Sequence, residues 1–223
     1  MNIPILYEDA YLLICIKPRG VLSQSDSKGK AAMPELLSAQ CGGTVYPVHR
    51  LDGEVSGLMV YAKTQKAAAG LSRLVSDHEK FTKTYYAVVE GVPDAPCGIL
   101  EDLLFHDRFK NKTYVVDRMR GGVKAAKLSY ETVATVEGGE VPMTLVKIRL
   151  YTGRSHQIRV QFASRGLPLA GDKKYGARTS GAIGLFSCGL QFRHPITGQA
   201  LDFQNPPSNE GIWTSFENNF PQA

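Results

Sequence analysis

The segment from His49 to Gly57 carries many of the side-chain types that can do chemistry: a histidine, an arginine, two carboxylates and a serine. His49, Arg50 and Asp52 come first, and the glycines at 53 and 57 permit unusual backbone angles. Loops of this kind, positioned by strands, commonly carry active sites. An ionised Asp52 can attack a carbon atom or accept a proton. The alternative interpretation is an ordinary polar turn closed by an Arg–Asp pair.

Residues 152–160 form a second candidate segment, with side chains that can meet an anion: Arg154, His156, Gln157 and Arg159. We expect a helix over Ser155–Ala163, with Ser155 as its N-cap and Gly166 as its end. Free N–H groups and the helix dipole at such an N-terminus favour an anion. An ordinary basic helix is the alternative interpretation.

Arg159 occupies an unusual position for a charge, because it lies between Ile158 and Val160. On the expected helix it shares a face with His156, three residues earlier. A buried arginine needs a carboxylate partner. Asp52 is the obvious candidate, so the two segments are expected to meet.

A third segment, Lys80–Gly91, carries Tyr85 and Tyr86 among basic and apolar residues. In a strand the two rings face opposite ways, so one can line a cleft while the other packs. An aromatic ring next to basic residues suits stacking on a nucleobase. Taken alone, this segment favours a plain structural tyrosine pair.

Positive charge is concentrated in two parts of the chain. The whole sequence has 26 basic and 21 acidic residues, a net charge of +5. Residues 106–130 and 147–178 are both strongly basic, so the remainder is net acidic. If the two basic parts lie together, they form a surface for a polyanion; two solvated basic loops are the alternative.

The sequence lacks the motifs that are typical of several classes of protein. The sequence has no phosphate-binding or dinucleotide-binding glycine motif and no serine-hydrolase elbow. Its histidines and cysteines lack zinc-ligand spacing, so we expect neither a metal nor a cofactor. The N-terminus is no signal peptide, and no apolar run could span a membrane. We therefore expect a cytoplasmic protein with no membrane partner.

Short apolar runs joined by turns predict more strands than helices. Expected strands are 3–7, 11–16, 58–62, 84–89, 128–136, 143–150, 185–192 and 200–203, and expected helices are 33–40, 65–76 and 212–218. Thr64 is the expected N-cap of the second helix. Hairpin links rather than repeated βαβ crossovers predict an α+β fold with a mixed, largely antiparallel sheet, flanking helices and a central catalytic cleft. We expect a single domain over residues 1–223.

Five motifs follow one another along the chain: His49-Arg50-Leu51-Asp52 with Ser56-Gly57, Lys83-x-Tyr85-x-Ala87-x-Val89-x-Gly91, Gly153-Arg154-x-His156-Gln157-Ile158-Arg159-Val160, Gly171-Asp172-x-x-Tyr175-Gly176 and His194-Pro195-x-x-Gly198. An earlier Lys17-Pro18-x-Gly20 accompanies them. Together, over essentially the whole chain, they resemble RluA-type pseudouridine synthases. Many relatives carry a separate N-terminal RNA-binding domain, whereas this sequence begins with the catalytic-type segment, so we expect a stand-alone catalytic domain.

The resemblance implies an RNA uridine isomerase that flips its target base and acts on rRNA or tRNA. It implies that Asp52 is the catalytic carboxylate, that Tyr85 stacks on the uracil and that Arg159 pairs with Asp52. Arg50 would help to fill the space that the flipped nucleotide leaves. The other expected substrate-binding residues are His49, Arg154, His156, Gln157 and Leu185.

Three readings of Asp52 remain open: attack on the base, attack on the ribose, and removal of a proton from the sugar. Two other functions compete with the isomerase. One is an RNA-binding or RNA-chaperone module whose chemistry is dispensable. The other is a base-flipping glycosylase. We expect a monomer, and the sequence does not identify the RNA or the modified uridine.

Overall fold

The computed structural model describes residues 1–26, 29–137 and 139–221. The chain forms two compact units and passes through each of them twice. The first unit contains Met1–Lys83 and Ser187–Asn205, and the second contains Thr84–Phe186 and Pro206–Ala223. Both combine largely antiparallel strands with helices, which confirms the predicted α+β class. The single domain over residues 1–223 stays a prediction.

The first unit is built on neighbouring strands that are, in order, β1 (Ile5–Glu8), β2 (Leu12–Lys17), β4 (Ser56–Ala62) and β10 (Leu185–Arg193). Two further strands pair with members of this row: β3 (Tyr46–Pro47) with β4, and β11 (Ala200–Gln204) with β10. The antiparallel β1–β2 pair confirms the predicted N-terminal hairpin. β10 begins in the second unit and continues into the first.

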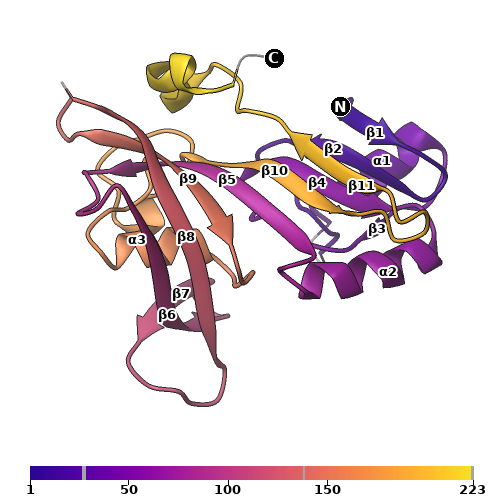
Figure 1. The fold of residues 1–223 in the computed structure, drawn as a ribbon, viewed down its shortest axis with the longest axis horizontal. Helices are drawn as coiled ribbons and strands as arrows, with labels where there is room; N and C mark the ends of the chain where they lie inside the picture. The colour runs from indigo at the N-terminus through magenta and orange to yellow at the C-terminus, as the bar shows by residue number, and fades with distance from the viewer. Residues whose placement is uncertain (27–28, 138, 222–223) are drawn as a thin grey trace. The chain divides into compact units, whose positions relative to one another are not determined.

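Two helices complete the first unit, α1 (Met33–Cys41) and α2 (Gln65–Ser76). The Thr64 hydroxyl accepts a hydrogen bond from the Ala67 N–H at 3.2 Å, which confirms the predicted N-cap. Figure 1 shows α2 beside β3 and β4, where it buries Ala67 and Leu71. The helix, the sheet and the returning chain thereby share one apolar core, which includes Leu12, Val60, Leu71, Leu190, Phe192 and Leu201.

The second unit is built on neighbouring strands that are, in order, β5 (Phe81–Glu90), β9 (Met143–Leu150), β8 (Val123–Val136), β6 (Cys97–Asp107) and β7 (Lys112–Val116). β5 begins in the first unit and continues into the second. The β6–β8 register runs from Cys97–Glu131 to Phe105–Val123, and Figure 1 shows these two long strands side by side. β7 pairs with the second half of β6.

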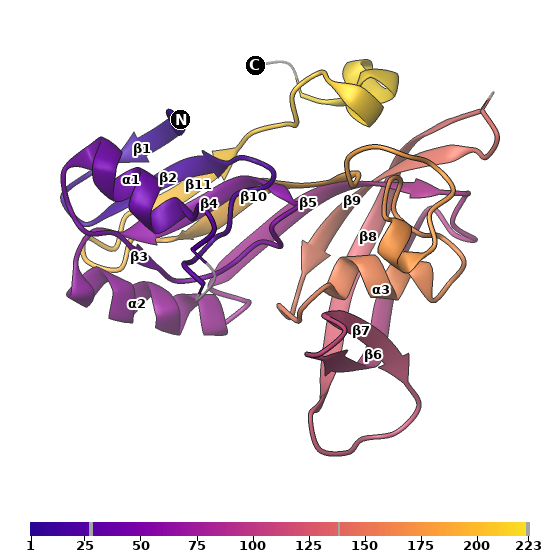
Figure 2. The ribbon, with the colours of Figure 1, turned by 180° about the vertical axis from the view of Figure 1, so that it is seen from behind.

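Helix α3 (Gln157–Ala163) covers one face of the second unit's sheet, as Figure 2 shows. Its Val160 packs with Leu104 of β6 and Ala126 of β8. Two 3₁₀ helices follow, η1 (Lys173–Tyr175) and η2 (Gly211–Asn219). The sequence placed a C-terminal helix over 212–218, and the structure has a 3₁₀ helix there.

The sequence assigned no element to β6 and β7, and it began β8 five residues late at Leu128. β6 mixes apolar and acidic residues without regular alternation, and β7 has only five residues. β6 pairs with β8, and β7 pairs with β6. These pairings stabilise strands that the local sequence does not predict. Within the described residues, no helix is long and apolar enough to cross a membrane.

Candidate active site

The turn that carries Asp52 is fixed on both sides of this residue. On one side, the Ser23 hydroxyl donates to the Leu51 carbonyl at 2.8 Å and accepts from the Leu51 N–H at 2.9 Å. On the other side, the Gly53 carbonyl accepts from the Gly20 N–H at 2.8 Å. The Val55 N–H closes the turn on the Asp52 carbonyl at 3.0 Å. The backbone on both sides of the half-buried Asp52 is therefore fixed.

Lys17 is a buried support of the same turn. Its amine is completely buried and donates to three carbonyls, those of Pro18 at 2.8 Å, Val21 at 2.7 Å and Gly53 at 3.2 Å. Burial lowers the pKa of Lys17 to about 8, against the opposing effect of nearby carboxylates. The early Lys-Pro-x-Gly segment thus ties the N-terminal hairpin to the Asp52 turn, a role that sequence reasoning missed.

His49 faces the interior of the first unit. Its Nε2 accepts a hydrogen bond from the Val60 N–H of β4 at 3.1 Å, and its ring lies 5.9 Å from that of Phe81. Burial, together with the charge of Lys83, lowers the pKa of His49 to about 3. The ring is therefore neutral at physiological pH and joins the segment before Asp52 to β4. Arg50, next to it, is exposed.

Two expected site residues lie on strands of the second unit, Tyr85 in the middle of β5 and Leu185 at the start of β10. Tyr85 of β5 and Leu185 of β10 are both buried. The neighbouring Tyr86 packs edge-on against Phe220 with ring centroids 5.0 Å apart. Tyr86 therefore packs within the second unit, and the stacking role of Tyr85 stays a prediction.

Arg159 forms a bidentate ion pair with Asp172. Its Nε donates to Oδ2 at 2.7 Å and its second amino group to Oδ1 at 2.8 Å. Both side chains are buried, with 6% and 1% of their surface exposed. Two parallel charge-assisted hydrogen bonds fix the plane of the guanidinium. The sequence correctly required a carboxylate for this arginine, but it did not find Asp172; the pairing with Asp52 stays a prediction.

Tyr175 holds Arg159 from a second direction. The guanidinium lies over the Tyr175 ring, 5.1 Å from its centroid. The Tyr175 hydroxyl accepts from the Thr113 N–H of β7 at 2.8 Å and lies 2.9 Å from Nδ1 of His156. Burial raises the pKa of Tyr175, so the hydroxyl stays protonated. One phenol therefore connects β7, the start of α3 and the buried arginine.

The start of α3 differs from the prediction. The helix begins at Gln157, and Ser155 is not its N-cap: the cap position is His156, whose φ of 52° is rare for a residue with a side chain. The side-chain amide of Gln157 holds the loop before the helix in place. Its oxygen accepts from the Arg154 N–H at 3.0 Å and from the Thr152 hydroxyl at 2.8 Å, and its nitrogen donates to the Lys127 carbonyl at 3.1 Å.

The expected RNA-contacting residues of this segment thus differ in exposure. His156 and Gln157 are buried and hold the loop before α3 in place. Arg154 is partly exposed, and its Nε donates to the Ala125 carbonyl of β8 at 2.9 Å. An anion site at the helix N-terminus gains no support, because α3 has only seven residues and the Gln157 N–H donates to the Arg154 carbonyl at 3.1 Å.

Glu90 at the end of β5 fastens the loop that carries Asp172. This buried carboxylate accepts from the N–H groups of Arg178 and Thr179, both at 2.8 Å, and from the Thr179 hydroxyl at 2.5 Å. The same hydroxyl accepts from the Gly171 N–H at 2.9 Å. Gly171 has φ +75°, and a Cβ there would lie 2.3 Å from the Ala182 carbonyl oxygen. The loop from residue 171 to 179 therefore has one defined path.

Replacing Glu90 with Gln should destabilise the protein at neutral pH. The amide places an N–H group where Glu90 accepts hydrogen bonds, and each hydrogen bond to a charge contributes about 1.5–3 kcal/mol. Burial raises the pKa of Glu90. The hydrogen bonds from Thr179 and Arg178 lower this pKa by a larger amount, so the folded-state pKa lies below the ordinary 4.5. The stabilisation is therefore present above that value and is lost as the pH falls through the folded-state pKa.

Urea unfolding of wild type and Glu90→Gln at pH 7, 5 and 4 measures this difference. Glu79→Gln, an exposed glutamate, is the matched control. We expect a gap between wild type and Glu90→Gln that narrows toward pH 4 and is absent in the control. A gap that is zero at pH 7 would contradict the role assigned to Glu90.

A sequence pattern that defines a family of proteins, described as RNA pseudouridylate synthase, matches residues 11–164. The chain belongs to this family. It is therefore an RNA pseudouridine synthase, an isomerase that modifies uridine in RNA. The predicted resemblance is confirmed at the level of the family.

Named pseudouridine synthases resemble the chain over most of its length. The ribosomal large subunit pseudouridine synthase D of Zymomonas mobilis is 32% identical over 220 residues, which cover 89% of this chain and 67% of the relative. The tRNA pseudouridine synthase C of Pectobacterium carotovorum is 31% identical over 224 residues, which cover 90% of this chain and 58% of the relative. The two names refer to different RNA classes.

Solved structures share the fold at lower identity. The human RNA pseudouridylate synthase domain containing 1 has a TM-score of 0.77 at 20% identity, covering 92% of this chain and 84% of its own. The human RNA pseudouridylate synthase domain containing 4 has a TM-score of 0.74 at 22% identity, covering 92% and 89%. These likenesses establish the pseudouridine synthase fold of the chain.

Proposed function

We propose that this pseudouridine synthase isomerises specific uridines of structured rRNA or tRNA by base flipping, with Asp52 as its catalytic carboxylate. The observation that carries the proposal is the turn at Asp52, whose neighbours Leu51 and Gly53 are held by buried donors and acceptors. A catalytic group must be held close to its productive geometry. A backbone fixed on both sides provides this by holding the residue that carries the carboxylate in one place.

The reaction itself needs no atom from outside the substrate. The bond between the ribose and N1 of uracil breaks, the base rotates, and a bond from the same ribose carbon to carbon 5 forms. The proton on carbon 5 leaves and N1 gains one. Asp52 can attack the base, attack the ribose or remove a sugar proton, and each route begins with the same ionised carboxylate.

Three buried side chains support the remaining steps of the proposal. Tyr85 stacks on the flipped uracil, and Leu185 packs beside the base. Arg159 pairs with Asp52 and keeps it ionised, since a nearby cation favours the charged form. Asp172 and Tyr175 already orient the Arg159 guanidinium before RNA binds. Such preorganisation lowers the cost of assembling the site when RNA binds.

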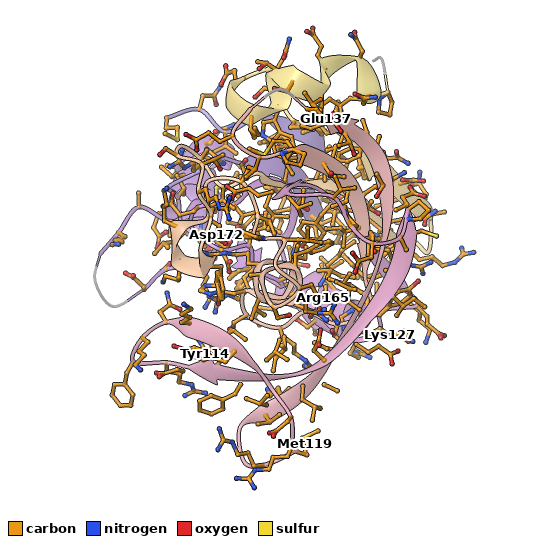
Figure 3. The ribbon with its side chains drawn as sticks, turned by 90° about the vertical axis from the view of Figure 1, so that its left-hand side faces the viewer. Tyr114, Met119, Lys127, Glu137, Arg165 and Asp172 are labelled. Carbon is orange, nitrogen blue, oxygen red and sulfur yellow. The ribbon has the colours of Figure 1, made fainter. Side chains whose placement is uncertain are left out.

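RNA contacts are proposed at the exposed arginines and at the end of the β6–β8 pair. Arg50 fills the space of the extruded nucleotide, and Arg154 contacts the RNA backbone, while His49, His156 and Gln157 position these loops. Figure 3 shows Met119, in the loop after β7, at the opposite end of β8 from Glu137. Arg118 and Arg120 flank Met119 in this loop, and Phe109, in the turn between β6 and β7, is fully exposed between Arg108 and Lys110. Exposed aromatic and basic side chains together suit RNA.

Tritium release tests the proposed function. Uridine-labelled rRNA and tRNA transcripts carrying ³H at carbon 5 are incubated with the protein, and tritium in water is counted. Only isomerisation releases this hydrogen, so we expect stoichiometric release from at least one transcript. RNA binding without release would favour the chaperone module, and free uracil in the supernatant would favour a glycosylase.

A further inference from the structure

The first unit contains a second buried lysine, Lys83 of β5, which has 7% of its surface exposed. Phe81, Lys83 and Tyr85 alternate along the strand and occupy the same face of it. The Lys83 amine lies 5.5 Å from the centroid of the Phe81 ring. This amine therefore lies on the strand face from which Tyr85 projects two residues later.

Lys83 differs from Lys17 in its partners. Lys17 gives its amine to three carbonyls, whereas no hydrogen-bond acceptor and no carboxylate lie within bonding distance of the Lys83 amine among the residues that the structure describes. The amine lies over the Phe81 ring instead, and a π face is a weak substitute for a hydrogen-bond acceptor. A buried charge without a partner is costly, so such groups are rare in folded proteins.

Its surroundings are apolar or neutral. Phe81 stacks on Phe192 with ring centroids 4.8 Å apart, and the nearby His49 ring is uncharged at physiological pH. Burial alone lowers the pKa of Lys83 to about 8. The amine is thus still mainly protonated at neutral pH, and it gains most from an anion that enters the site.

We propose that Lys83 is a substrate-binding residue whose ammonium binds a phosphate oxygen of the RNA next to the flipped uridine. A lysine is a compact point charge that suits phosphate. The position fits this role, because Lys83 precedes Tyr85 by two residues and lies on the same face of the strand. The proposal rests on the proposed function, since it assumes that the uracil stacks on Tyr85.

The test compares Lys83→Met and Lys83→Arg with Lys66→Met, which removes the same charge from the exposed face of α2. All three changes are made in an Asp52→Asn background, so that binding is measured without turnover. The probe is the transcript that releases most tritium with the wild-type protein. Affinity is measured across a salt series, and thermal unfolding is measured without RNA.

For Lys83→Met we expect affinity at low salt to fall about tenfold and the slope of log affinity against log salt to decrease by about 0.7 to 0.9, the value for one lost phosphate contact. Lys83→Arg should keep the slope. Thermal stability should be unchanged or raised in Lys83→Met, because an unpartnered buried charge is removed. Lys66→Met should change neither the salt slope nor the thermal stability.

An unchanged salt slope in Lys83→Met would overturn the proposal. A marked loss of stability would also overturn it, because the amine would then be serving the fold. Failure of the proposed function is recognised separately: no transcript would release tritium with the wild-type protein, whatever the lysine variants do.

Discussion

Replacing Asp52 with Asn is expected to abolish uridine isomerisation while the fold and most of the RNA affinity are kept. Asparagine has nearly the same shape, so the loss is confined to the charge and to the ability to attack or accept a proton. The bonds described for the turn join the backbone of Leu51, Asp52 and Gly53 to their neighbours, and these bonds remain in the variant. A general base or nucleophile of this kind contributes at least about 10²–10⁴-fold in rate.

Single-turnover tritium release measures the effect, with enzyme in excess over RNA so that binding does not limit the rate. Glu54→Gln is a matched control, because it makes the same chemical change two residues along the same turn. Glu54 is exposed and forms a surface ion pair with Arg19 at 3.0 Å. The control should retain nearly full activity. If Asp52→Asn retained a rate within tenfold of wild type, another group would have to be the catalytic carboxylate.

Replacing Asp172 with Asn is expected to cost both stability and activity. One amide oxygen cannot accept both guanidinium bonds, and the amide nitrogen would face Arg159 with its own hydrogens. Removing one carboxylate from a buried ion pair leaves the remaining charge less compensated, and such a change costs up to about 3–5 kcal/mol. The guanidinium would also lose its fixed plane, so the rate of isomerisation should fall at least about tenfold.

Two companion variants separate these effects. Glu101→Gln removes an exposed ion pair with Lys127 in the same unit, and it should cost less than about 1 kcal/mol. The double variant Arg159→Met, Asp172→Leu replaces the pair with apolar groups and should recover most of the lost stability without recovering activity. Denaturant unfolding and tritium release give the two quantities. Recovery of activity in the double variant would refute a catalytic role for Arg159.

The sequence indicated residues whose side-chain type differs from that of their neighbours, such as a charged residue within an apolar segment. Arg159 between two apolar residues predicts a buried charge in need of a carboxylate, and the structure has that arrangement. The choice of Asp172 depends on a loop whose path Glu90 fixes from more than eighty residues away. No local pattern carries such information, since the fold alone brings the two segments together.

Polar residues were harder to assign, because their types alone do not show which way they face. His49 accepts a backbone bond from β4, and Gln157 organises the loop before α3, whereas their expected contacts with substrate stay predictions. The prediction of Ser155 as the N-cap was wrong. The N-cap position is His156, one residue after Ser155, and His156 has a left-handed conformation that its residue type does not predict. Short strands such as β7 depend on a partner strand and escape prediction.

The return of the chain to the first unit has a consequence for how the protein is made. Residues 1–83 leave the ribosome early, but their apolar core also requires Leu190, Phe192 and Leu201. Until about two hundred residues have been synthesised, β4 lacks its neighbour β10 and part of this core faces water. Residues 1–83 therefore cannot complete their core before β10 and β11 are synthesised, and a truncated product that lacks these strands would expose an unpaired strand edge to other chains.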